Sequence, residues 1–149
     1  MQGLGSGAIS LYGNPEQKQN ILEEVSAGRM IAGFALSEPD AGSDVAAMRS
    51  KAFSTTEGWK VNGEKSWISN GGIADYYTFF AKTSDQPGSG GISAFILKAD
   101  NPGLSIAERQ EVMAPHPLAR LQLKDAELSP EALLGCLLYT SPSPRDQRG

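Results

Sequence analysis

The sequence has one cysteine, Cys136, and one histidine, His116. A single cysteine excludes a disulfide within the chain and favours a reducing compartment, and this pair leaves no His/Cys cluster for zinc. No apolar run reaches about 18 residues, so we expect no transmembrane helix, and we see no targeting segment with a basic start and an apolar core. The net charge of −4 gives no electrostatic reason to expect binding to nucleic acid or to an anionic membrane.

Hydrolase motifs are also lacking. No serine lies in G-x-S-x-G, and His116 stands between Pro115 and Pro117 with no orienting partner visible in the sequence, so we interpret it as a turn residue. Residues 3–8 formally fit G-x-G-x-x-A, but no strand precedes them, as a dinucleotide-binding site would require. For residues 1–11 we therefore expect a flexible stretch.

The 17 glycines and 9 prolines favour short strands joined by turns. One helix is expected to begin at Asn14, with Pro15 at its first position and Gln17 completing a capping box, and to end at Gly28. Its apolar stripe consists of Ile21, Leu22 and Val25. Strands are predicted over residues 30–37, 47–54, 76–82, 92–98, 104–108 and 118–123, with a hairpin over 58–69 that turns at Asn62-Gly63. The predicted fold is mainly β, a sandwich or small barrel preceded by one α-helix.

Residues 136–149 depart from this pattern. The run Thr140-Ser141-Pro142-Ser143-Pro144-Arg145-Asp146 has no periodicity, and its prolines prevent a helix or a strand ladder. We interpret the segment as translated linker or adapter sequence that is not native; a genuine disordered tail is the alternative.

Two segments carry the chemistry. In the first, residues 32–44, an apolar strand ends at Ser37 and a turn built from Pro39, Asp40, Gly42 and Asp44 follows, so that backbone amides and serine hydroxyls could hold a phosphate or the edge of a heterocycle. An ordinary capped surface turn is the alternative interpretation. In the second, residues 65–72, Trp67 offers a flat face and Ser69 a hydroxyl, as a flavin would need; a core tryptophan is the alternative.

Together the two segments resemble the acyl-CoA dehydrogenase family. Residues 35–44 are similar to its first signature and residues 65–72 to its second flavin-contacting segment. Residues 12–18, 91–95, 100–104 and 133–135 also follow the family's order, so the resemblance extends from about Leu11 to Gly135. It implies three parts: residues 1–30 end an N-terminal helical domain, residues 31–135 form the middle β-barrel domain that contacts FAD and CoA, and residues 136–149 are the non-native or disordered tail.

The resemblance also implies the site. The backbone of Phe34 and Leu36 and the Ser37 hydroxyl would meet the pyrimidine side of the flavin. Gly42 and Ser43 would approach the FAD pyrophosphate, and Ser43 also the CoA. Trp67 with Ile68 would lie along the ring, and Ser69 would donate towards N5. Ser89 and Gly90 would line the CoA channel. Threonine is frequent in the family at positions 37 and 69, where serine leaves the hydroxyl less preorganised.

The implied reaction is FAD-dependent α,β-dehydrogenation of an acyl-CoA thioester, with electron-transfer flavoprotein as the electron acceptor. The family's base is a carboxylate of a C-terminal helical domain, and no residue here matches it, so we expect an inactive fragment of a homotetrameric parent. That parent would be cytoplasmic in a bacterium or in the mitochondrial matrix of a eukaryote. A binding or assembly module that keeps the β-domain without catalysis is the alternative.

Overall fold

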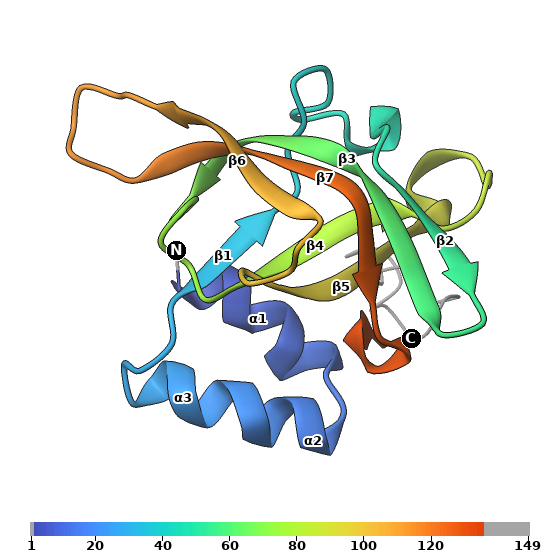
Figure 1. Ribbon diagram of the computed structural model, residues 1–149, viewed down its shortest axis with the longest axis horizontal. Coiled ribbons are helices and arrows are strands. Elements are labelled where there is room, and N and C mark those ends of the chain that lie inside the picture. The colour runs from blue at the N-terminus through green and yellow to red at the C-terminus, as the bar shows by residue number, and fades with distance from the viewer. Residues whose placement is uncertain (1, 136–149) are drawn as a thin grey trace, which may run out of the picture.

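The computed structural model describes residues 2–135, which form two helical segments against a β-sheet (Figure 1). The predicted non-native or disordered tail, 136–149, lies outside these described residues. The helical segments comprise α1 (Gln2–Tyr12), α2 (Pro15–Gln17), a π-helical turn at Lys18–Leu22 and α3 (Glu23–Ser26). The strands are β1 (Ala32–Ala35), β2 (Lys51–Thr55), β3 (Gly58–Ser69), β4 (Tyr76–Lys82), β5 (Ile92–Lys98), β6 (Leu104–Gln110), β7 (Leu118–Leu128) and β8 (Leu133–Leu134). In the described residues no helix is long and apolar enough to cross a membrane.

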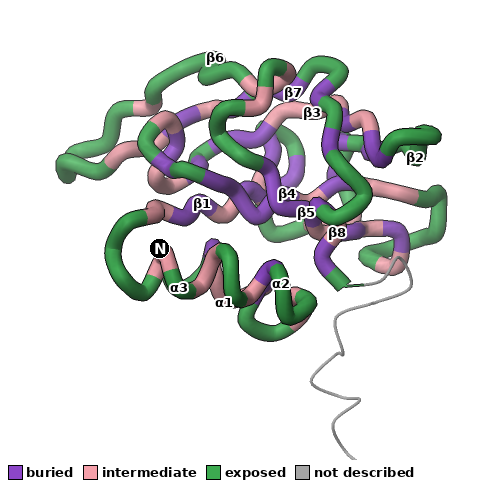
Figure 2. Tube along the Cα trace, turned by 60° about the horizontal axis from the view of Figure 1, so that its bottom comes forward, coloured by how far each residue is buried: buried purple, intermediate pink, exposed green. Residues whose placement is uncertain are grey.

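The sheet has the strand order β6-β7-β3-β2-β4-β5-β8, and β1 pairs in parallel with β4 outside this path. A single parallel pair, Lys51 with Lys82, joins β2 to β4, so the sheet divides there into two halves. The apolar core lies where β3 and β7 pack on β4 and β5, and Figure 2 shows burial concentrated in these strands. The mainly β prediction is confirmed, and the sheet does not close into a barrel.

The helix predicted from Asn14 is present with its capping box. The Asn14 carboxamide accepts from the Gln17 amide at 2.8 Å, and Gln17 Oε1 accepts from the Asn14 amide at 2.9 Å. Gly28 ends the helix with a φ of +72°. The predicted stripe of Ile21, Leu22 and Val25 packs on the second apolar cluster, around Ile9 and Tyr76.

The prediction of a flexible stretch at residues 1–11 is wrong, because α1 covers Gln2–Tyr12. Its glycines disfavour an isolated helix, and packing on the sheet decides the outcome. Ile9 is fully buried, and the Gly5 carbonyl accepts from Thr78 Oγ1 at 2.6 Å. Gln2 anchors the first turn, since its Oε1 accepts from the Ala32 amide at 2.6 Å.

Gly5 and Gly3 should respond to alanine in opposite ways. A Cβ at Gly5 would lie 2.7 Å from Ala32 Cβ and 2.8 Å from the Gly33 carbonyl, whereas a Cβ at Gly3 would meet nothing within 4 Å. We expect Gly5→Ala to lower the free energy of unfolding by about 1–3 kcal/mol through overpacking. Gly3→Ala should raise it by up to about 1 kcal/mol through helix propensity. Urea denaturation of both variants measures this, and equal shifts would show that α1 does not pack closely on β1.

The hairpin predicted to turn at Asn62-Gly63 is also misplaced. β3 runs unbroken through these residues, and the turn lies at residues 56–57, where Thr55 pairs with Gly58. Asn62 instead serves a bulge in β7, because its Oδ1 accepts from the amide of Asp125, which has a φ of +48°. Of the other predicted strands, 76–82 and 92–98 match β4 and β5, and the rest differ at their ends.

Candidate functional site

A bulge at the end of β3 defines the centre of the site. The β3–β7 register shifts between Lys65 and Ile68, so Trp67 leaves the ladder and takes a φ of +59°. A positive φ is an outlier for a bulky residue and persists only where the surroundings hold it. The Trp67 side chain is 60% exposed, whereas Trp59 is buried against Phe95. Trp67 is therefore not the core tryptophan of the alternative interpretation.

Neighbouring elements hold this segment, residues 66–70, which we call the bulge segment. The Ser66 amide donates to the Ser37 carbonyl at 2.9 Å, and the Trp67 amide donates to Gln110 Oε1 at 2.8 Å. Ser69 Oγ and His116 Nε2 are 3.0 Å apart. His116 thus has a partner that the sequence analysis did not foresee.

The second part of the site is the segment after β1, residues 36–44, which we call the strand-to-turn segment. The turn is closed by reciprocal bonds between Glu38 and Ala41, with N···O distances of 3.0 and 3.2 Å. Gly42 and Ser43 are exposed, and their amides donate to no acceptor among the described residues. Ser37 is half-buried, and its hydroxyl makes no hydrogen bond with any of the described residues. These groups are available to a ligand.

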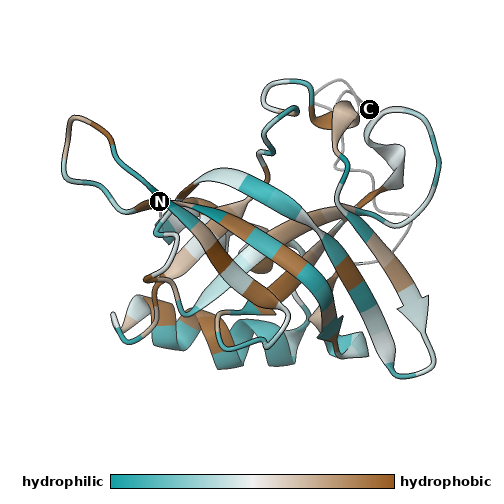
Figure 3. Cartoon of the chain, turned by 45° about the horizontal axis from the view of Figure 1, so that its top comes forward, coloured by the Kyte–Doolittle hydropathy of each residue, from teal (hydrophilic) through white to brown (hydrophobic). Residues whose placement is uncertain are grey.

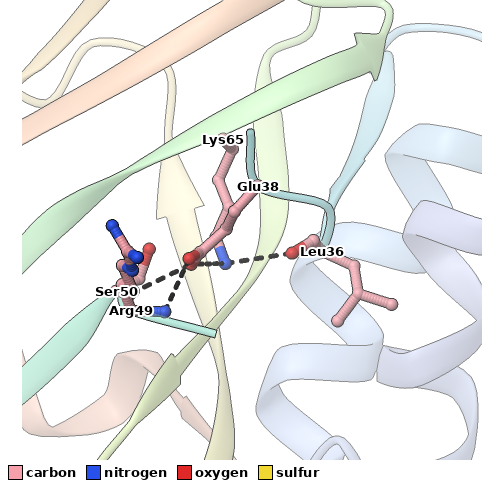
Figure 4. A network of polar contacts seen from close by, with 5 residues as sticks. All are labelled: Leu36, Glu38, Arg49, Ser50 and Lys65. Atoms are coloured by element: carbon pink, nitrogen blue, oxygen red, sulfur yellow. Dashed lines mark hydrogen bonds and ion pairs between the residues drawn. The ribbon is translucent and has the colours of Figure 1, made fainter. Parts of the chain in front are cut away.

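A buried ion pair joins the two segments (Figure 4). Lys65 Nζ lies 2.9 Å from Glu38 Oε1 and also donates to the Leu36 carbonyl at 3.1 Å. Glu38 further accepts from the amides of Arg49 and Ser50, at 2.6 and 3.0 Å. The Lys65 side chain is fully buried and lies over the Phe79 ring, 4.9 Å from its centre. The pair therefore fixes the backbone between Leu36 and Glu38 onto β3.

Burial and pairing shift the pKa values of Lys65 and Glu38 in opposite directions. Burial lowers the pKa of Lys65 from 10.5 to about 8, although Glu38 favours the charged form. Burial acts to raise the pKa of Glu38, but hydrogen bonds from Lys65, Ser50 and the Arg49 amide hold that pKa below its ordinary value.

An apolar cavity of about 460 Å³ opens beside the end of β1. Phe34 and Phe80, whose rings are 5.1 Å apart, form part of its wall, and Leu36 extends that wall towards the turn. α1 lines another part of the cavity with Gly3, Leu4, Gly7, Ala8, Leu11 and Tyr12. The remaining lining includes Val45, Ser89, Ile92, Ser93, Ala94, Leu134 and Gly135.

Residues 33–126 match the family model described as acyl-CoA dehydrogenase, middle domain. The chain belongs to the acyl-CoA dehydrogenase family. It is 42% identical over 108 residues to a probable acyl-CoA dehydrogenase, fadE25, of Mycobacterium leprae, covering 72% of this chain and 28% of that protein. The structure of butyryl-CoA dehydrogenase from Megasphaera elsdenii superposes with a TM-score of 0.86 at 32% identity, over 89% of this chain and 36% of the other. A structure of the FAD complex of PigA gives 0.86 at 31% identity, over 91% and 36%.

The chain thus spans about a third of the length of these relatives. The matched segment begins at Gly33, within β1, and contains both the bulge segment and the strand-to-turn segment. The helices α1 to α3 precede it.

Within this acyl-CoA dehydrogenase middle domain, residues of both segments that are predicted to contact FAD lie next to each other, but one of the predicted side chains is buried in the core. Ser37 and the bulge segment are joined by the Ser66–Ser37 backbone bond, so the residues predicted for the pyrimidine side and those predicted to lie along the ring adjoin. The Ile68 side chain is buried in the core, which leaves only its backbone for a ligand. Of the residues predicted for the substrate, Ser89 lines the cavity, whereas Ser43 and Gly90 do not.

Several functional candidates were missed from the sequence. Glu38 and Lys65 lie inside the two recognised segments, but 27 residues separate them and nothing local indicates that they pair. Gln110 and His116 lie on a hairpin with no recognised motif. The residues of α1 that line the cavity lie in the stretch that the sequence predicted to be flexible.

Proposed function

We propose that this chain supplies the flavin-contacting part of an FAD-dependent acyl-CoA dehydrogenase. The observation that carries the proposal is the exposed, strained Trp67 on a bulge segment that also carries Ser69 and is bonded to the backbone of Ser37, whose neighbour Leu36 lines an apolar cavity. Exposed aromatic faces with fixed donors suit a planar heterocycle, and strain of this kind clusters at functional sites.

The FAD contacts follow from the available groups. The Ser37 hydroxyl and the backbone of Phe34 and Leu36 would hold the pyrimidine side, and Trp67 with the Ile68 backbone would lie along the ring. Ser69 would donate towards N5. The free amides of Gly42 and Ser43 would receive the pyrophosphate, because unpaired amides in a turn bind anions without a desolvated cation.

For the substrate, the cavity beside Phe34 and Leu36 has the apolar lining that an acyl chain requires. Ser89 on its wall, with the neighbouring Gly90 and the exposed Ser43, would contact the CoA portion. When bound, FAD supplies the acceptor for the hydride that leaves the substrate β-carbon. The chain's own residues bind and orient; we assign the base that removes the α-proton to a C-terminal domain beyond this chain.

We infer for the parent protein a homotetramer that passes its electrons to an electron-transfer flavoprotein. The competing proposal is a binding or assembly module that keeps the β-domain without flavin. The exposure of Trp67 argues against it, since a module without a ligand gains nothing from a strained surface tryptophan.

FAD titration of the 149-residue chain tests the proposal. We expect weak but saturable binding with quenching of flavin fluorescence, and no turnover of an acyl-CoA. Trp67→Ala should weaken binding about 5- to 150-fold, because stacking on an aromatic ring contributes about 1–3 kcal/mol. Phe53→Ala is the matched control, since Phe53 is also aromatic and 55% exposed but lies on β2.

Absence of saturable binding would reject the flavin site and favour the assembly module. Equal affinities for the Trp67→Ala and Phe53→Ala variants would show that FAD binds elsewhere. Dehydrogenation by the 149-residue chain alone would contradict the assignment of the base to another domain.

A further inference from the structure

The β6–β7 hairpin reaches the bulge segment from outside both recognised segments. Gln110 and Leu118 form the last pair of this hairpin, and the loop between them projects from the body of the molecule (Figure 3). Besides the β7 pairs of Ile68 and Ser69, the end of the hairpin makes three bonds to the bulge segment: Gln110 accepts from the Trp67 amide, His116 bonds Ser69, and the Pro117 carbonyl accepts from the Asn70 amide at 2.9 Å. Three residues of the bulge segment are thus held by the end of one hairpin.

The contact with Gln110 explains how Trp67 keeps its conformation. Leaving the β7 ladder costs Trp67 its strand partner, and a positive φ adds about 1–3 kcal/mol of strain. The 2.8 Å bond to Gln110 Oε1 gives the Trp67 amide an acceptor in place of the one lost with the ladder. Gln110 therefore holds the backbone conformation from which the Trp67 ring projects.

The contact with His116 determines where the Ser69 proton points. A hydroxyl has one proton and two acceptor sites. If His116 Nε2 carries hydrogen, it donates to Ser69 Oγ across the 3.0 Å separation and the Ser69 proton is left for a ligand. If Nε2 is bare, the Ser69 hydroxyl donates to the ring and is lost as a donor.

We propose that Gln110 and His116 are positioning residues for the flavin, acting through Trp67 and Ser69, with His116 in the form that carries hydrogen on Nε2. The proposal rests on the flavin site proposed above. It assigns to the β6–β7 hairpin the task of presenting a ring face and a hydroxyl proton to the same ligand.

Paired substitutions at Gln110 test the first contact. Gln110→Met keeps the length of the side chain and removes the acceptor, whereas Gln110→Glu keeps an acceptor oxygen for the Trp67 amide. We expect hydrogen exchange of the Trp67 amide, measured by NMR without ligand, to accelerate about tenfold in Gln110→Met only. The dissociation constant for FAD should rise about tenfold in the same variant and stay within about threefold of wild type in Gln110→Glu.

Paired substitutions at His116 test the second contact. His116→Gln retains an N–H donor for Ser69, and His116→Phe retains a ring without one. We expect His116→Phe to raise the FAD dissociation constant about tenfold and His116→Gln to restore affinity. In a Ser69→Ala background the two variants should bind alike, because the effect passes through the Ser69 hydroxyl.

The outcomes separate the two proposals. If the wild-type chain shows no saturable FAD binding, the flavin site is rejected and the positioning role with it. If the wild-type chain binds FAD but Gln110→Met and His116→Phe match it, only the positioning role is overturned. Urea denaturation of all four variants should give unchanged free energies of unfolding within about 1 kcal/mol; a larger loss that parallels the affinity loss would assign Gln110 and His116 to folding alone.

Discussion

Lys65→Met is expected to lower the free energy of unfolding by about 3–5 kcal/mol, because it leaves the Glu38 carboxylate buried without its counter-charge. Methionine fills a similar volume, so the loss does not come from a cavity. The Leu36 carbonyl also loses its donor, which loosens the backbone between β1 and the turn. Urea denaturation at pH 7 measures the effect.

The double variant Lys65→Met/Glu38→Gln separates the charge from the packing. A glutamine carries no charge, and its single oxygen accepts from one of the Arg49 and Ser50 amides, which donate to different oxygens of Glu38, so the double variant should regain part of the stability that Lys65→Met loses. Arg29→Met is the control for an exposed pair: Arg29 and Glu24 are 61% and 40% exposed, and their separation should change stability little. A double variant as unstable as Lys65→Met would show that the lysine acts by packing instead.

Local patterns predicted the fold well wherever local chemistry decided it. The capping box of Asn14 and Gln17 is settled by neighbouring residues, and β4 and β5 by short, mostly buried runs rich in apolar and aromatic residues. The turn predicted at Asn62-Gly63 is wrong because the same residue types that favour a turn also suit a bulge. The bond between Asn62 and Asp125 joins residues 63 positions apart, so no local pattern indicates it. The helix over residues 2–12 was not predicted, because a helix with several glycines forms only where it can pack closely on a sheet.

The site divides in the same way. Ser37, Trp67 and Ser69 stand in recognisable segments, so their neighbourhood could be predicted from order and spacing. Ile68 could not be assigned to ligand or core, because a bulge between Lys65 and Ile68 changes which side chains face outwards, and a bulge has no sequence signature of its own here. Gln110 depends on that same bulge, since it accepts from the Trp67 amide that the bulge takes out of the ladder, whereas His116 bonds the Ser69 hydroxyl across 47 positions of sequence.

Because of the buried pair, the free energy of unfolding should also depend on pH in the alkaline range. The pKa of Lys65 is lowered by burial to about 8 in the folded chain, from 10.5, so between these values the unfolded chain binds more protons than the folded one. Stability therefore rises with pH in this window, and it is lost as the pH falls through about 8. Relative to Lys65→Met/Glu38→Gln, the wild type should gain about 2 kcal/mol between pH 7 and pH 9.5.

Using the double variant as reference cancels the other groups that titrate in this range. Burial raises the pKa of Tyr76 to about 12, and both proteins keep this tyrosine, so its contribution is shared. In acid the sign is the same: the lowered pKa of Glu38 contributes stability above about pH 4.5 that is lost as the pH falls further. Urea denaturation at pH 7, 8, 9 and 9.5 gives the difference directly. A difference that stays flat or falls towards pH 9.5 would mean that Lys65 keeps its proton in the fold, held by Glu38 more strongly than burial opposes it.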